Sequence, residues 1–429
     1  MSWILWPRRM LLLLRNQKAQ KRFLQISISF QEQLDIKEKE VRGRKTPLRV
    51  GFFVYNDSVF QLRRVFELMQ RDSAFEPFIV VSSGIRLDSV AERNQQETHR
   101  RALENLTRKY PGYVFDSFKD GEYIDFSGKC DLVACMNPYD EYLEEHSRIS
   151  YLAQHGALVF FSHYGFDGGV VWDHNYLKMA SFGYLWRFYS GTSDMREALH
   201  RYQPGLKIHN RVVLSGNPKI EPLAEQRVVA RRRKKVIICP HHTIDPAEKF
   251  HLSNFVRFAD FFLTLPERYP QIDWVFRPHP ILMPKMVQKG FWTELQLKEY
   301  IAKMKSFPNM EYQEGGDYYP LFVNSDAMIQ DCCAFLAEYL VTGHPQCYLL
   351  KSERHAMTQY EGLGLEMLDH VYKGYNEDDI LAFIDRVVLA GIDDQYSNRQ
   401  SFVDAKLKIN YPNVSQWIVD DIKKSLNRK

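Results

Sequence analysis

IDWVFRPHP, residues 272–280, is an apolar segment that ends in charged and ring-containing side chains. A second segment, residues 325–338, reads SDAMIQDCCAFLAE and passes from an apolar run into a helical pattern. Short apolar runs of this kind are typical of strands in a parallel sheet, which are buried on both faces. Open α/β sheets bind ligands at the carboxyl ends of their strands. We therefore expect the functional residues of this chain at these two strand ends.

Further apolar runs alternate with helical patterns on either side of these segments. The first series predicts strands at residues 48–55, 75–81, 131–136, 157–162 and 212–216. The second series predicts strands at residues 236–239, 272–276, 327–329 and 346–350. This alternation predicts an α/β fold of two doubly wound, Rossmann-like domains, residues 48–222 and 234–390, that face each other across a cleft. Neither domain has a G-x-G-x-x-G fingerprint or a P-loop, so the usual dinucleotide and Walker-type sites are disfavoured.

Composition limits the class of protein. The 429 residues are 45% hydrophobic and 14% aromatic, enough for sizeable cores. The chain has 57 Lys and Arg against 53 Asp and Glu, so its net charge of +4 gives no reason to expect a nucleic-acid partner. Its six cysteines lie mostly in apolar runs without a CxxC pair, which indicates buried thiols in a reducing compartment and predicts a cytoplasmic protein.

Both ends of the chain lie outside the two series. Residues 1–15 read MSWILWPRRMLLLLR, which is too short to span a bilayer and lacks the order of a secretion signal. The segment suits either an interfacial anchor on an anionic membrane surface or a first helix packed on the protein. Residues 31–47 are polar without sustained apolar periodicity and are predicted to be a linker. Helices in residues 391–429 are predicted to pack across the domain junction.

The first motif is the RPHP turn. The two prolines fix the backbone and remove two N–H donors, so Arg277 and His279 should be held in an extended turn at the strand end. An arginine can bind phosphate oxygens in a bidentate manner, and a histidine can carry a proton or stabilise charge on a phosphate. The alternative is a purely structural turn with a hydrogen-bonded histidine.

The second motif is a strand, turn and helix across residues 326–338. Asp331 is predicted at the N-cap, with Cys333 and Ala334 in the first helical turn. The start of such a helix offers backbone N–H groups and a positive dipole end to a diphosphate. Glu338, two turns on, is a candidate to accept hydrogen bonds from ribose hydroxyls. The alternative is an ordinary capped core helix.

These motifs, taken in order, resemble the CDP-glycerol glycerophosphotransferases of teichoic-acid and capsule assembly. The resemblance covers roughly residues 157–350 and rests on four segments: GNPK at 216–219, CPHHTI at 239–244, RPHP at 277–280 and the SDAMIQD run with the FLAEYL helix that follows it. Members of that family have the two-domain GT-B architecture. The resemblance therefore implies a GT-B-like fold, with the acceptor bound by the amino-terminal domain and the nucleotide donor by the second.

Carried onto this chain, the resemblance implies a set of donor-binding residues. Arg277 and His279 would contact the donor pyrophosphate, and His241 and His242 would line the same pocket. Lys219 stands where the family usually has an arginine, so it supplies charge without the bidentate fork. Glu338 stands where many members have an aspartate that holds the cytidine ribose.

The chain departs from the family at two places. Cys333 and Ala334 replace serines whose hydroxyls the family uses at the helix start. In the amino-terminal domain, the catalytic His-Gly pair of the family aligns with Tyr164 and Gly165, and His163 lies one residue early. The base that activates the acceptor is then His163, reached through a turn at Gly165, or another group such as Tyr164 or Asp167.

The resulting prediction is a transferase that moves glycerol phosphate from CDP-glycerol, or a related CDP-polyol, to a hydroxyl of a membrane-linked or growing polyol-phosphate or polysaccharide acceptor. His279 is the first candidate catalytic residue and His163 the second. The histidines show no metal-ligand spacing along the chain, so neither a metal nor another cofactor is predicted. The protein is expected at the cytoplasmic face of the membrane. Two alternatives stay open: a nucleotide-sugar glycosyltransferase of the same fold, and a catalytically silent family member that binds polymer or a partner enzyme.

Overall fold

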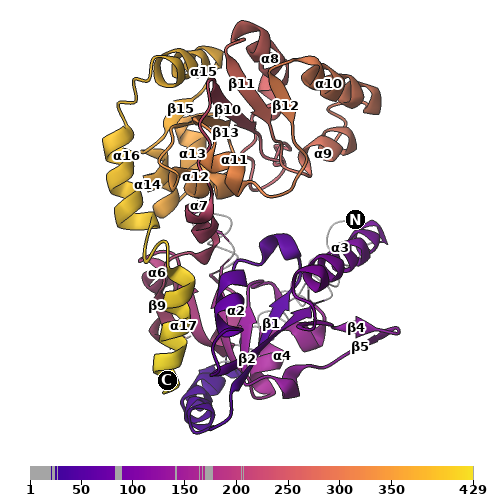
Figure 1. Cartoon of the computed structure of the whole chain (residues 1–429), viewed down its shortest axis with the longest axis vertical. Coiled ribbons are helices and arrows are strands. Elements are labelled where there is room, and N and C mark those ends of the chain that lie inside the picture. Colours follow the sequence, from indigo (N-terminus) through magenta and orange to yellow (C-terminus); the bar gives the residue numbers. More distant parts are fainter. Residues whose placement is uncertain are drawn as a thin grey trace, which may run out of the picture. The chain divides into compact units, whose positions relative to one another are not determined.

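The chain divides into two compact units in a computed structural model. The structure describes residues 21, 25–26, 28–82, 89–140, 143–163, 165–166, 168–169, 177–203, 205 and 207–428. The first unit comprises Met1–Gly165, His174–Lys219 and Ile409–Lys429. The second comprises Phe166–Asp173 and Ile220–Lys408. Each unit contains one parallel β-sheet with helices around it (Figure 1).

The sheet of the first unit has seven parallel strands in the order β3-β2-β1-β6-β7-β8-β9. Their bounds are Val114–Asp116, Phe75–Val81, Leu48–Val54, Leu132–Cys135, Leu158–Ser162, Leu185–Ser190 and Val212–Leu214. The central strands β6 and β7 are buried along their whole length, as expected for a sheet covered on both faces. The helices of this unit include α2 (Arg63–Met69), α3 (Ser89–Lys109), α4 (Ile149–Gln154) and α6 (Met195–Tyr202).

A helix over residues 28–42 occupies most of the segment predicted to be a linker. Phe30, Leu34 and Val41 are buried on it and belong to the core of the first unit. Its polar side is fixed too, because the indole Nε1 of Trp186 donates to Glu38 at 2.7 Å. The prediction of a linker was therefore wrong for this helix: three apolar side chains spread over many polar residues are enough to anchor it.

The carboxyl end of the chain returns to the first unit. Helix α17 (Val414–Ser425) packs against α2 in this unit (Figure 1). Tyr189 donates to Asp421 at 2.8 Å, and Lys423 pairs with Asp72 at 2.6 Å. Gly216 lies against Ile409, just before α17, and has a φ of 85°. A Cβ at residue 216 would lie 2.0 Å from the carbonyl oxygen of Ile409. Only glycine fits this approach.

The sheet of the second unit has six parallel strands in the order β12-β11-β10-β13-β14-β15. Their bounds are Met310–Tyr312, Ile272–Phe276, Lys234–Cys239, Ala327–Gln330, Gln346–Leu349 and Tyr372–Gly374. Its main helices are α8 (Phe255–Arg268), α9 (Leu282–Gln288), α10 (Glu294–Ser306), α12 (Cys333–Leu340), α13 (Glu353–Gln359), α14 (Leu363–Leu368), α15 (Glu377–Ala382) and α16 (Tyr396–Phe402). Helix α10 packs on β12 and α8 on β11 (Figure 1).

The α/β fold class is confirmed, and the structure contains every strand that the two apolar series predicted. The short edge strands β3, β12 and β15, and strand β8, were not predicted. All six cysteines are free and five are buried, as expected. Among the described residues, no helix combines the length and apolar character needed to cross a membrane. The apolar segment at residues 1–15 lies outside the described residues.

Candidate active site

The candidate site is at the carboxyl edge of the second sheet. Strands β11, β10 and β13 are neighbours and run parallel, so their ends meet at one edge. His279 follows β11, His241 and His242 follow β10, and helix α12 begins just after β13. These three segments lie side by side because their strands are adjacent.

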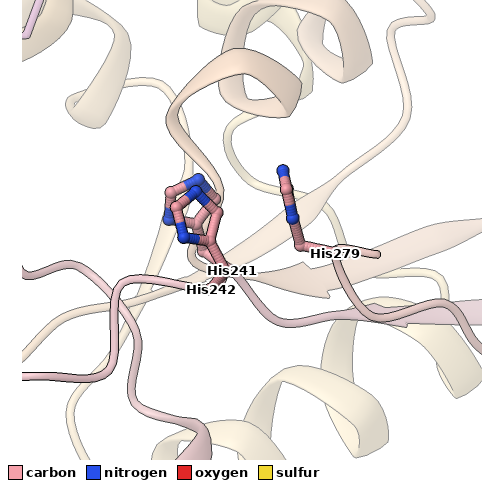
Figure 2. A group of neighbouring side chains, drawn as sticks. All are labelled: His241, His242 and His279. Atoms are coloured by element: carbon pink, nitrogen blue, oxygen red, sulfur yellow. The ribbon is translucent and has the colours of Figure 1, made fainter. Parts of the chain in front are cut away.

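Three imidazole rings form the centre of this edge. A nitrogen of each of His241, His242 and His279 lies within 4.8 Å of the others. The ring centroids are 4.3 Å apart for His241 and His242, 4.3 Å for His242 and His279, and 5.3 Å for His241 and His279. Figure 2 shows His279 facing the other two rings, which lie close together. Spacing along the chain did not indicate this group because its members come from two separate strand ends.

Backbone hydrogen bonds hold the two histidine-bearing turns together. The N–H of Arg277 donates to the carbonyl of Ile238 at 2.9 Å, and the N–H of His279 donates to the carbonyl of Pro240 at 3.0 Å. These bonds continue the pairing of β10 with β11 beyond the strands themselves. The relative positions of the rings are therefore set by the sheet and by the prolines in each turn.

The protonation state of His279 follows from its contacts. The backbone N–H of Ile281 donates to its Nδ1 at 3.2 Å, so in the neutral ring the proton must be on Nε2. Burial, followed by repulsion from His242 and Lys285, lowers the pKa of His279 to about 3. At neutral pH the ring is uncharged and Nε2–H is a hydrogen-bond donor.

The other two rings are also neutral at pH 7. Burial lowers the pKa of His241 well below its usual value, and the neighbouring His242 and His279 add to this effect. Burial and then Lys285 lower the pKa of His242. Nδ1 of His241 is hydrogen-bonded to Oγ1 of Thr243 at 2.9 Å. Nδ1 of His242 is buried and has no hydrogen-bond partner among the described residues.

Asp331 binds backbone groups of the turns around the site and is not the helix cap that was predicted. The N-cap of α12 is Cys332, which makes no side-chain capping bond. The buried carboxylate of Asp331 accepts instead from the backbone N–H groups of His241, at 2.6 Å, and Asn254, at 2.5 Å. Burial raises the pKa of Asp331 to about 6 despite these two bonds. Asp331 thus positions the turn after β10.

Lys285 is a cation of this site that the motifs did not indicate. It lies on α9, immediately after the RPHP turn, and is 8% exposed. Its ammonium group is paired with the carboxylate of Glu248. The charge of Lys285 lowers the pKa values of all three histidines, so it acts on the whole cluster. The signal in the sequence was its place at the end of the first turn of the helix that follows the RPHP segment.

Arg277 points its guanidinium to the loop after β12. Nη1 donates to Gln313 at 2.9 Å and Nη2 donates to the carbonyl of Gly316 at 2.6 Å. Its carbon Cζ lies 5.9 Å from the ring centroid of Tyr318, within the range of a cation–π contact. Arg277 is 6% exposed, and two of its N–H groups are used within the protein. Its predicted contact with a pyrophosphate stays a prediction.

Glu338 lies on α12 and is completely buried. Tyr318 donates its hydroxyl hydrogen bond to this carboxylate, and the ring of Tyr318 packs on Phe335 with centroids 4.9 Å apart. Burial and then Glu338 raise the pKa of Tyr318 well above its usual value. In this structure Glu338 holds the tyrosine, and its role toward a ribose stays a prediction.

Helix α12 presents its first turn at the same edge, with Cys333 half-buried and Ala334 beside it. The backbone N–H of Cys332 donates to Oε1 of Gln330 at 2.8 Å. The first turn contains no hydroxyl side chain, so any anion here would be bound by backbone N–H groups.

Three of the remaining predicted residues, His163, Gly165 and Lys219, belong to the first unit. His163 is buried directly after β7. The amide Nδ2 of Asn217 donates to the carbonyl of Gly165 at 3.0 Å, which joins the GNPK segment to the turn after His163. Lys219 follows in the same segment, where its backbone N–H donates to the Asn217 side chain at 2.9 Å. Tyr164 and Asp167 lie outside the described residues.

The fold belongs to the GT-B-like class, with one parallel α/β sheet in each of two units. No protein-family model and no curated protein sequence matches the chain. Two kinds of enzyme are among the solved structures that resemble it, and each shares the fold at low sequence identity.

The first kind is the wall teichoic acid polymerase TagF. Its sequence is 14% identical to this chain, and the structural match covers 100% of this chain and 99% of TagF with a TM-score of 0.51. A TagF variant soaked with CDPG gives a TM-score of 0.56 at 13% identity. The second kind is UDP-N-acetylglucosamine 2-epimerase. The Neisseria meningitidis enzyme bound to UDP-GlcNAc is 13% identical, covers 88% of this chain and 100% of that chain, and gives a TM-score of 0.57. At these identities the likeness establishes the fold alone.

Proposed function

We propose that this protein transfers glycerol phosphate from CDP-glycerol to a hydroxyl of a membrane-linked or growing polyol-phosphate or polysaccharide acceptor and releases CMP. The observation that carries the proposal is the neutral His279, with its proton on Nε2, at a strand end beside Lys285. The likeness to TagF over the full length of the chain supports it.

The reaction breaks the bond between the distal phosphorus and the oxygen that bridges it to CMP, while the acceptor oxygen bonds to that phosphorus. Charge builds up on the leaving phosphate of CMP. A phosphate of this kind has a pKa near 6, so it can leave at neutral pH without taking a proton. A neutral Nε2–H of His279 that donates a hydrogen bond to it is therefore sufficient, and a strongly acidic group is not required.

The positive charge for the diphosphate comes, in this proposal, from Lys285. The three rings are neutral, so none of them offsets the donor's negative charge at pH 7. Lys285 is held near them by Glu248. The first turn of α12 adds backbone N–H groups at the neighbouring strand end. Arg277 would then order the loop containing Gln313 and Gly316, which we assign to the nucleoside.

The acceptor hydroxyl is assigned to the first unit. His163 lies after β7, in the turn that Asn217 holds through Gly165. A histidine there is a candidate base for the attacking hydroxyl. We retain His163 as this candidate, with Tyr164 and Asp167 as its alternatives.

A second candidate function keeps the fold and changes the donor to a nucleotide sugar. The 2-epimerase structures, among them the Neisseria meningitidis enzyme bound to UDP-GlcNAc, favour testing it. A ligand that binds the folded protein raises its thermal stability. We expect CDP-glycerol to raise the melting temperature more than CDP-ribitol or UDP-GlcNAc does, and the Lys285→Met variant to lose this rise. A larger effect of UDP-GlcNAc would favour the second candidate, and no effect of any donor would favour a silent binding protein.

A further inference from the structure

The three histidines also have the chemistry of a metal site. Neutral imidazole nitrogen is the commonest metal ligand in proteins, and zinc sites that keep an open position have three protein ligands. His241, His242 and His279 offer three such nitrogens within 4.8 Å of one another, in a buried to half-buried position. We propose that these residues bind one divalent transition-metal ion that prefers nitrogen ligands, with Zn²⁺ as the ion expected.

The geometry requires only a small closure. Three nitrogens at about 2.1 Å from a tetrahedral zinc ion lie about 3.4 Å apart. Because the observed limit is 4.8 Å, the nitrogens must approach one another by up to about 1.4 Å. Rotation of the side chains provides this movement, while the backbone bond from His279 to Pro240 keeps the two turns in place.

Each ring has a nitrogen that suits the role. His242 has a buried Nδ1 with no hydrogen-bond partner among the described residues. His241 can bind through Nε2, because its Nδ1 is oriented by Thr243, and a second hydrogen bond of this kind is typical of metal-ligating histidines. For His279, coordination through Nε2 moves the ring proton to Nδ1. The bond from the Ile281 N–H, which is long at 3.2 Å, is then lost.

The neighbouring charges act in opposite directions. The ammonium group of Lys285 repels a cation, whereas the carboxylate of Glu248, its partner, attracts one. Replacing Lys285 by methionine removes the repulsion and leaves the carboxylate. The Lys285→Met variant should therefore bind the metal more tightly than the wild type, although it should bind a phosphate donor more weakly.

A bound ion has a consequence for activity that rests on the proposed function. The metal takes Nε2 of His279, which is the atom that would donate to the leaving phosphate. Zn²⁺ at this site would therefore inhibit the transferase and compete with the donor.

The test measures the metal directly and needs no donor. Metal-free protein is titrated with Zn²⁺ by calorimetry and with Co²⁺ by visible absorption, which reports a tetrahedral nitrogen site. The His242→Ala and His242→Asn variants are compared with His355→Ala, which removes a half-buried histidine of the same unit outside the cluster. Circular dichroism confirms that each variant is folded.

We expect wild type and His355→Ala to bind one ion with equal affinity and to give the intense Co²⁺ spectrum. Both His242 variants should bind at least about tenfold more weakly and lose that spectrum. Equal Zn²⁺ affinity in wild type and folded His242 variants, or no binding by the wild type, would overturn the proposal. Either result leaves the transferase proposal intact, because that proposal needs no metal.

Discussion

The backbone N–H of Ile281 donates a hydrogen bond to Nδ1 of His279 at 3.2 Å. This bond determines which nitrogen of the neutral ring carries the proton, and it places the donor on Nε2. Because the ring is half-buried beside His242 and Lys285, its pKa is low and it remains neutral under physiological conditions. Nε2 of His279 is therefore available to donate a hydrogen bond, and the proposed function takes its positive charge from Lys285.

The low pKa of His279 predicts how stability depends on pH. The pKa is about 3 in the folded protein and about 6.5 in an unfolded chain. Between these values the unfolded chain binds more protons, so the free energy of unfolding falls as the pH falls below about 6.5. Between about pH 7.5 and pH 5, the free energy of unfolding should fall by about 1–2 kcal/mol less in His279→Asn than in wild type. Urea unfolding at the two pH values measures this difference. An unchanged slope in His279→Asn would contradict the assigned protonation state.

Lys285 is predicted to bind the donor. Replacing it with methionine should lower kcat/KM for CDP-glycerol by about 10- to 100-fold, the usual effect of losing a hydrogen bond from a charged group. The matched control is Lys289→Met, which removes an exposed lysine paired with Asp245 just after the same helix and should change kcat/KM by less than about twofold.

The Lys285→Met variant also leaves Glu248 without its partner. The double variant Lys285→Met, Glu248→Gln separates the two effects. Activity restored in the double variant would mean that Lys285 only neutralises Glu248, contrary to the prediction. Activity that stays low would agree with a direct role toward the phosphates.

The helix at residues 28–42 should contribute to the stability of the first unit. Leu34 is completely buried on this helix, whereas Ile36 is 59% exposed. Leu34→Ala should lower the free energy of unfolding by about 2–5 kcal/mol, and Ile36→Ala should change it by less than about 0.5 kcal/mol. Equal urea midpoints for the two variants would mean that the segment behaves as the linker that its composition suggested.

Gly112 is required only by its backbone conformation, whereas Gly216 is required by its backbone conformation and by a close contact. Both have positive φ, 85° and 84°, but a Cβ at Gly112 would meet nothing within 4 Å, whereas one at Gly216 would lie 2.0 Å from the Ile409 carbonyl oxygen. Gly112→Ala should cost about 1–2 kcal/mol for the backbone conformation. Gly216→Ala should cost about 1–3 kcal/mol more, because the carbonyl must move. Denaturant unfolding measures both, and equal costs would contradict the close packing of residue 216 on Ile409.

The sequence predicted the sheets well because buried parallel strands are nearly continuous apolar runs. It failed at β8, where Arg187 interrupts the run Leu185–Ser190. It also failed at residues 28–42, where Phe30, Leu34 and Val41 follow helical spacing too sparsely to stand out among polar neighbours. In both places the decisive contacts are with residues far away in the chain, such as Trp186 with Glu38.

The candidate site was predicted in part. The strand ends with His241, His242 and His279 were identified, but their approach to one another depends on β10 and β11 being neighbours, which spacing along the chain does not reveal. The contacts of Arg277 with Gln313 and Gly316 depend likewise on a loop after the unpredicted strand β12. Asp331 fits an N-cap by its position, yet its carboxylate binds two N–H groups from other segments.

The most direct test of the central claim is CMP release from CDP-glycerol by purified wild type, His279→Ala and His355→Ala, with and without a membrane extract as acceptor. We predict acceptor-dependent CMP release by wild type and His355→Ala, and its loss in a folded His279→Ala variant. Undiminished release by His279→Ala would contradict the role of His279, and no release by wild type with any acceptor would contradict the proposed transfer of glycerol phosphate.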